Sequence, residues 1–156
     1  MLNDSLFSSK KEDWCTPVDF FKKLDDEFHF TLDPAATEKS AKCKKFYTPE
    51  DDGLSKSWAG ETVFCNPPYG CDISKWVQKG YEESLNPDTV VVMLIPSRTD
   101  TSYWHDYIFN KASDIRFIRG RLTFTDEDGN PNTDGKGHVN SAPFPSAVIV
   151  YGKKEN

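Results

Sequence analysis

The chain has 156 residues, of which 37% are hydrophobic and 28% charged, and its formal net charge is −6 at pH 7. This length and balance predict one globular domain with a buried core, and no apolar run approaches the ~20 residues that span a bilayer. The negative net charge disfavours a broad phosphate-binding surface, although lysines in 39–45 and arginines in 116–121 form local basic runs.

The N-terminal residues and the cysteines indicate the cellular setting. Residues 1–12 are polar and lack the apolar segment of a secretion signal, so we expect a flexible leader and a cytoplasmic protein. The folded domain is expected over 13–152, followed by a tail at 153–156. The four cysteines include no C-x-x-C pair, which argues against a zinc site, and we expect reduced thiols and no metal.

The first third of the domain predicts a helix followed by two short strands. Thr16 is a good N-cap and Pro17 suits the first helical position, after which an apolar stripe follows at helical spacing. Residues 28–32 alternate as in a strand, which ends at Asp33. An acidic residue at a strand end, followed by small residues, is what a cofactor crevice in an α/β sheet requires. A second short strand is expected at 45–47.

The middle of the chain predicts a strand–helix–strand unit. A β-prone run at 62–65 stops at an amide and two prolines, and 74–85 then has the apolar face of an amphipathic helix. Residues 89–95 are almost all apolar and β-branched, which predicts a central strand buried on both faces. This order favours parallel pairing of the two strands.

The last third predicts one more helix and two strands around a long loop. The helix is expected at 102–112, the first strand at 115–118 with a continuation through 119–124 past a glycine bend, and the final strand at 147–151. Residues 126–143 form a polar loop that is long enough to be functional. The whole pattern predicts an α/β fold in a minimal single domain, with a mostly parallel central sheet flanked by helices.

The sequence Asn66-Pro67-Pro68-Tyr69 begins where the strand at 62–65 ends. Two consecutive prolines cannot donate ladder hydrogen bonds and restrict the residues before them, so we expect a rigid loop. The Asn66 side-chain oxygen and the Pro67 carbonyl offer two acceptors for the N–H groups of a planar exocyclic amine, and the Tyr69 ring can stack on a flipped-out base. These residues predict a preorganised catalytic loop for methyl transfer to an amine.

Six short blocks occur in order between residues 14 and 151. They are Trp14-x-Thr16-Pro17, Phe30-Thr31-Leu32-Asp33-x-Ala35-Ala36, Asp52-Gly53-Leu54-x3-Trp58, Asn66-Pro67-Pro68-Tyr69-Gly70, Gly120-Arg121-Leu122-x-Phe124 and Pro143-Phe144-Pro145-Ser146. Together they resemble the phage-type DNA N6-adenine methyltransferase (Dam) family. The resemblance implies a Rossmann-like class I methyltransferase fold, S-adenosylmethionine as methyl donor, site-specific methylation of adenine N6 in DNA, and a phage or prophage origin.

The same resemblance assigns roles to individual residues. It assigns catalysis to Asn66, Pro67, Pro68 and Tyr69. The cofactor-binding residues that it implies are Trp14, Thr16 and Pro17 at the methionine end, Asp52 and Leu54 near the adenosine, and also Asp33, Ala35, Ala36 and Asn66. The F-x-G-x-G motif of other methyltransferases is absent. The candidate DNA contacts are Ser97, Arg98, Arg119, Arg121 and the loop at 126–143, and ordinary surface charge is the other interpretation of the arginines.

Two alternatives stay open. The N-P-P-Y motif also serves other planar amines, so cytosine N4, an RNA base or a protein glutamine is an alternative substrate. A catalytically silent cofactor- or DNA-binding module is the alternative from a different class, and the small size and negative charge favour it.

Overall fold

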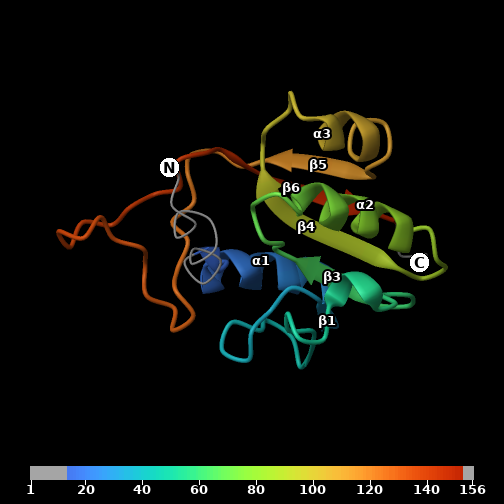
Figure 1. Ribbon diagram of the computed structural model, residues 1–156, viewed down its shortest axis with the longest axis horizontal. Coiled ribbons are helices and arrows are strands. Elements are labelled where there is room, and N and C mark those ends of the chain that lie inside the picture. Colours follow the sequence, from blue (N-terminus) through green and yellow to red (C-terminus); the bar gives the residue numbers. More distant parts are fainter. Residues whose placement is uncertain (1–13, 153–156) are drawn as a thin grey trace.

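Six strands form one sheet in the order β2-β1-β3-β4-β6-β5 (Figure 1). The computed structural model describes residues 14–152, so the leader expected at 1–12 and the tail expected at 153–156 lie outside the described residues. The strands are β1 (Leu32–Asp33), β2 (Lys45–Phe46), β3 (Thr62–Cys65), β4 (Val90–Pro96), β5 (Asp114–Phe117) and β6 (Ser146–Tyr151). The helices are α1 (Val18–Phe28), α2 (Ile73–Glu83), α3 (Ser102–Tyr107) and the 3-10 turn η3 (Gly53–Ser55).

The sheet is mixed rather than uniformly parallel. β2, β1, β3 and β4 pair in parallel, which confirms the predicted strand–helix–strand unit, with Thr62 opposite Val90 and Cys65 opposite Met93. β6 runs antiparallel between β4 and β5. The segment 118–145, which joins β5 to β6, therefore leaves the sheet at the same edge as the carboxyl ends of β3 and β4. Parts of the chain that are far apart in sequence meet at this edge.

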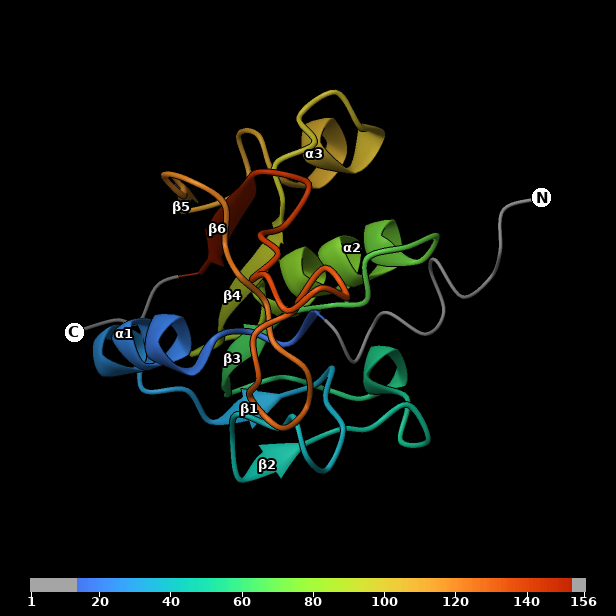
Figure 2. The ribbon, with the colours of Figure 1, turned by 90° about the vertical axis from the view of Figure 1, so that its left-hand side faces the viewer.

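Helices cover both faces of the sheet. Figure 2 shows α1 on one side of the strands and α2 with α3 on the other. Side chains alternate along a strand, so Val91 and Met93 of β4 pack in the cluster that contains α2 and α3, while Val92 and Leu94 pack in the cluster that contains α1 and part of 118–145. All seven residues of β4 are buried, as its apolar sequence predicts. Within residues 14–152, no helix combines the length and apolarity needed to cross a bilayer.

The start and the end of α1 differ from the prediction. Pro17 has a ψ of 137°, which is extended, so it is the N-cap and the helix begins at Val18; the Thr16 side chain does not cap it. Phe28 is the last helical residue, and His29 turns the chain with a left-handed φ of 59°. The strand expected at 28–32 is consequently reduced to the two residues of β1.

Two later boundaries were also wrong. β5 ends at Phe117, because the chain turns out of the sheet near Gly120, whose φ is 77°. The expected continuation through 119–124 is therefore part of the long connection 118–145. The helix expected at 102–112 ends at Tyr107. Trp104, on that helix, donates its indole N–H to the Pro96 carbonyl at 3.2 Å and so ties α3 to the end of β4.

Candidate active site

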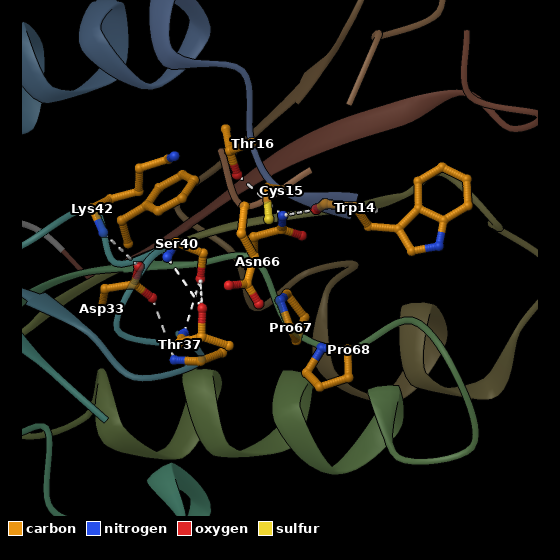
Figure 3. A pocket seen from close by; sticks show the side chains of 13 residues that line it. Trp14, Cys15, Thr16, Asp33, Thr37, Ser40, Lys42, Asn66, Pro67 and Pro68 are labelled. Atoms are coloured by element: carbon orange, nitrogen blue, oxygen red, sulfur yellow. Dashed lines mark hydrogen bonds between the residues drawn. The ribbon is translucent and has the colours of Figure 1, made fainter. Parts of the chain in front are cut away.

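The side-chain amide of Asn66, just after β3, is held at two points. Its Nδ2 donates to the Trp14 carbonyl at 2.7 Å and to the Thr16 hydroxyl at 3.1 Å (Figure 3). A carbonyl can only accept, so this pairing fixes which end of the amide is the nitrogen. The Oδ1 atom is buried, and it has no hydrogen-bond partner in the described part of the chain. An unpaired buried acceptor is costly, so this oxygen is suited to receive an incoming donor.

Tyr69 is anchored by its hydroxyl, which donates to the Leu94 carbonyl of β4 at 2.8 Å. Burial raises the pKa of Tyr69 well above its usual value. The centre of its ring lies 6.5 Å from that of Trp14, 6.1 Å from that of Phe124 and 5.6 Å from that of Phe144. The residue as a whole remains partly exposed. Tyr69 therefore presents a ring surface, while its neutral and bonded hydroxyl is unsuited to act as a base.

Asp33 ends β1 and organises the loop that follows. Its residue surface is 4% exposed, and its carboxylate accepts the backbone N–H of Ala35 at 3.3 Å and that of Lys42 at 3.0 Å. Within this loop, the Thr37 N–H donates to the Ser40 hydroxyl and the Ser40 N–H donates to the Thr37 hydroxyl. The carboxylate and the hydroxyl pair hold this loop in one shape at the carboxyl edge of the sheet.

Asp52 and Leu54 reach the same edge because Gly53 packs directly against the chain after β1. A Cβ on Gly53 would collide with the Pro34 carbonyl oxygen, so only glycine permits this approach. The Gly53 carbonyl accepts the indole N–H of the fully buried Trp58 at 3.0 Å. The glycine and the tryptophan of the third sequence block thus hold the turn at Asp52 in place.

Two neighbouring hollows open along this edge and share Ala35 and Pro68. The predicted cofactor residues that line the first are Trp14, Thr16, Asp33, Ala35 and Asn66 (Figure 3). Those that line the second are Ala35, Asp52 and Leu54. Pro17 and Ala36 line neither hollow, and Ala36 is 1% exposed. Within residues 14–152, no group of three or more His, Cys, Asp or Glu side chains is placed to hold a metal ion.

Sequence reasoning missed four hydroxyl-bearing or charged residues that line the first hollow: Thr37, Ser40, Lys42 and Glu127. They lie in irregular segments, where no periodicity marks the positions that face inward. The Thr-x-x-Ser spacing, typical of reciprocally bonded turns, was the available signal for the first two. Lys42 and Glu127 bring opposite charges to one hollow, and nothing local in the sequence predicts that meeting.

The residues considered for DNA contact follow β4 and β5, whose carboxyl ends lie at this edge of the sheet. Ser97 and Arg98 follow β4, and Arg98 is exposed with its guanidinium 5.6 Å from the centre of the Phe144 ring. The other two, both exposed on segment 118–145, are Arg119 and Arg121. The structure therefore brings the rings around Tyr69 and an exposed arginine together through Phe144.

The segment 118–145 is anchored at its base and exposed beyond it. Cys15 and Thr125 exchange backbone hydrogen bonds of 3.0 Å in both directions. Further along, the carboxylates of Asp126 and Asp134 each close a tight turn by accepting backbone N–H groups, and these bonds hold the pKa of both below the usual range. The exposed part of this segment thus carries fixed negative charges as well as arginines.

Comparison with known proteins identifies the family. A family model described as DNA N-6-adenine-methyltransferase (Dam) matches residues 4–153. The chain belongs to this family. It is 31% identical over 137 residues to the DNA N-6-adenine-methyltransferase of Haemophilus phage HP1 (strain HP1c1), an alignment that covers 86% of this chain and 78% of the relative. It is 33% identical over 120 residues to the DNA N-6-adenine-methyltransferase of Escherichia phage T1, which covers 75% of this chain and 48% of that relative.

The resemblance carried by the six sequence blocks is thereby confirmed. The chain spans about half the length of the phage T1 relative and more of the phage HP1 relative. Membership of a DNA N-6-adenine-methyltransferase family implies a methyl donor.

Proposed function

We propose that this chain is a site-specific DNA methyltransferase that transfers a methyl group from S-adenosylmethionine to N6 of an adenine flipped out of DNA. Family membership and the names of the two phage relatives support this reaction. The observation that carries the proposal is the buried Oδ1 of Asn66, which lacks a partner among residues 14–152 while Nδ2 is fully used. We assign a Rossmann-like class I methyltransferase domain to 13–152 and place it in the cytoplasm of a bacterial host.

The two hollows fit S-adenosylmethionine, an elongated molecule with an amino-acid end and an adenosine end. The first offers Lys42 for the carboxylate of the amino acid, and Asp33 with Glu127 for its ammonium group. The second offers the exposed carboxylate of Asp52 as an acceptor for ribose hydroxyls, beside the apolar Leu54. When bound, the cofactor supplies an electrophilic methyl group. Ala35 and Pro68 line both hollows, so they lie where such a ligand would pass from one hollow to the other.

The remaining predicted cofactor residues act as supports in this proposal. Trp14 and Thr16 form the wall of the first hollow next to Asn66. The Pro17 carbonyl accepts the Phe21 N–H at 3.0 Å at the start of α1. Ala36 is buried and lines neither hollow.

Asn66 and Pro67 prepare the amine for attack. In adenine the N6 lone pair is delocalised into the ring, so the nitrogen is a poor nucleophile. The Asn66 Oδ1 and the Pro67 carbonyl each accept one N–H, which draws the nitrogen toward tetrahedral geometry and frees its lone pair. The doubly held amide and the rigid Pro67-Pro68 pair keep these acceptors in place before the base arrives. The bond from N6 to the methyl group would form as the bond from the sulfonium sulfur to that methyl group breaks, which would leave S-adenosylhomocysteine. The methylated nitrogen would then release its extra proton to water without a general base.

Tyr69 and the neighbouring surface receive the DNA. The partly exposed Tyr69 ring stacks on the flipped base, which must leave the duplex to reach Asn66. Arg98, Arg119 and Arg121 contact phosphates or bases, and Ser97 lies between Arg98 and the end of β4. We assign the loop at 126–143 to DNA contact as a short recognition element.

Methylation of a defined DNA with labelled S-adenosylmethionine, followed by nucleoside analysis, tests the proposal. We expect the label in N6-methyldeoxyadenosine. Asn66→Ala should lower methyl transfer by about 10³-fold while the cofactor Kd changes little, because the acceptor oxygen is lost and the hollows remain. Asn86→Ala is the matched control, since Asn86 bonds to Glu83 at the far end of α2.

Each of the other outcomes would contradict one part of this proposal. Label found only in N4-methylcytosine, RNA or protein would establish one of the alternative amine substrates. Cofactor binding without transfer would establish a silent binding module. Undiminished transfer by Asn66→Ala would refute the role given to its side-chain oxygen.

A further inference from the structure

Thr16 bonds to the catalytic loop and does not cap the helix that follows it. It is 2% exposed, and its hydroxyl oxygen accepts a hydrogen bond from Asn66 Nδ2 at 3.1 Å. The helix α1 begins two residues later and does not use this hydroxyl as a cap. The Thr16 hydroxyl therefore contacts Asn66, the residue whose Oδ1 must accept a hydrogen bond from the substrate.

The Asn66 amide has two N–H protons, and each has an acceptor. The Trp14 carbonyl lies 2.7 Å from Nδ2 and the Thr16 hydroxyl 3.1 Å from it. With a single acceptor the amide could turn about its last side-chain torsion, which has a broad energy minimum in asparagine. Two acceptors at fixed positions stop that rotation. Donation of both protons also polarises the amide and strengthens Oδ1 as an acceptor.

The segment that carries Thr16 is itself fixed. Cys15 is bonded through its backbone to Thr125 in both directions at 3.0 Å. The Trp14 ring packs edge-on against Phe124, with ring centres 5.4 Å apart. Thr16 consequently cannot follow the amide if the amide turns, which is the property required of a residue that sets an orientation.

We propose that Thr16 is a positioning residue: its hydroxyl, with the Trp14 carbonyl, locks the Asn66 amide so that Oδ1 faces the target amine. This proposal rests on the proposed function, because it names what makes Asn66 competent as an acceptor. Thr16 acts through Asn66 and touches no reacting atom. Its place in the wall of the first hollow is then secondary to its contact with the amide.

The test compares Thr16→Val, which keeps the shape and removes the hydroxyl, with Thr16→Ser, which keeps the hydroxyl. Both are assayed in the full chain with labelled S-adenosylmethionine and DNA. We expect Thr16→Val to lower kcat by about tenfold and Thr16→Ser to restore most of it. The cofactor Kd should stay within about twofold of the wild-type value in both. Thr16→Ala is a second hydroxyl-free variant in case valine disturbs the packing.

A second readout does not depend on activity. The side-chain NH2 signals of Asn66, assigned by their loss in Asn66→Ala, report hydrogen bonding through their rate of exchange with water. Both protons should exchange slowly in the wild type, one should exchange faster in Thr16→Val, and Thr16→Ser should return it to slow exchange.

Two results would overturn the proposal. One is a folded Thr16→Val or Thr16→Ala with unchanged kcat and unchanged amide exchange. The other is a raised cofactor Kd with kcat preserved, which would make Thr16 a ligand contact. If the wild-type protein does not methylate adenine in DNA, the proposed function fails, whereas the amide signals still decide whether Thr16 holds Asn66.

Discussion

The loop at 66–69 and the segment 118–145 meet at one edge of the sheet but are stabilised in opposite ways. In the loop, the two side chains to which we assign function are held by other parts of the chain, Asn66 through its amide and Tyr69 through its hydroxyl. In the segment, the base is paired and packed, but the exposed turns at Asp126 and Asp134 are closed by their own carboxylates. Fixed acceptors suit chemistry on a single nitrogen, whereas self-contained turns suit contact with a larger and more variable surface.

After the loss of the side-chain amide in Asn66→Ala, the largest expected effect comes from a charge placed in the fixed loop. In Asn66→Asp the Nδ2 that donates to Trp14 becomes a carboxylate oxygen, which would face the Trp14 carbonyl as acceptor against acceptor. We expect methyl transfer to fall by about 100-fold at pH 7, measured as labelled methyl incorporation. Activity should recover partly as the pH is lowered, because a protonated carboxyl can again donate to the carbonyl.

The matched control for that change is Asn110→Asp. Asn110 is exposed and has a left-handed φ of 67°, a conformation that aspartate also tolerates. Asn110→Asp should retain wild-type methyl-transfer activity. Full activity of Asn66→Asp itself would mean that the amide nitrogen is not needed to orient the oxygen.

The next prediction separates the two regions by pH. The pKa of Tyr69 is raised in the folded protein, so above about pH 10 the unfolded chain ionises while the folded chain stays neutral, and stability falls as pH rises. Tyr69→Phe should reduce this loss by up to about 1.4 kcal/mol per pH unit, measured by urea unfolding between pH 8 and about 11. An unchanged slope in Tyr69→Phe would contradict the buried environment of the hydroxyl.

Acidic pH should affect the segment 118–145 rather than the loop at 66–69. The carboxylates of Asp126 and Asp134 have lowered pKa values, so their contribution is present above about pH 4 and is lost as the pH falls through their folded values. The amide signals of Gly129 and Gly135, in the two turns, should shift in that range before the Tyr69 loop changes. Simultaneous change in both regions would show that the turns are not self-contained.

The smallest expected effect concerns an arginine between the two regions. Arg98 is exposed and contacts Phe144, so Arg98→Ala should weaken DNA binding about fivefold and lower the salt-dependence slope by about one. The matched control is Arg116→Ala, because Arg116 is already paired with Glu27 at 2.6 Å and Asp114 at 2.8 Å. Arg116→Ala should lower the free energy of unfolding by roughly 1 kcal/mol or less. It should leave the salt-dependence slope of DNA binding, measured by fluorescence anisotropy, unchanged. Equal slopes for the two variants would remove Arg98 from the DNA surface.

The sequence predicts those elements whose pattern is both regular and strong. The sequence predicts β4 because residues 89–95 are almost all apolar and β-branched, which suits a strand buried on both faces. It predicts α2 because the apolar residues repeat at helical spacing. The loop at 66–69 is predicted to begin at a strand end because two prolines forbid continuation of the ladder. Each of these signals is local, so no knowledge of distant contacts was needed.

The errors arise where a distant contact overrides a local signal. Threonine is a common N-cap residue, but the hydroxyl of Thr16 bonds to Asn66, 50 residues away in the sequence. Residues 28–32 alternate like a strand, yet Phe28 completes α1, and the Phe30 N–H donates to the Asp25 side chain instead of a ladder partner. Lys42 and Glu127 line the same hollow, but both lie in irregular segments. No periodic pattern in the sequence predicts the path of such a segment.

The close packing of Gly53 against Pro34 has a consequence for inhibitors. Because Gly53 packs against the Pro34 carbonyl, the turn at Asp52 is held next to the chain that carries Ala35, which lines both hollows. This packing contact therefore helps to set the distance between the two hollows. On the proposed cofactor assignment, a synthetic compound that joins an amino-acid head to a nucleoside would have to match this distance. Linker length is consequently the first variable that a medicinal chemist would optimise against this protein.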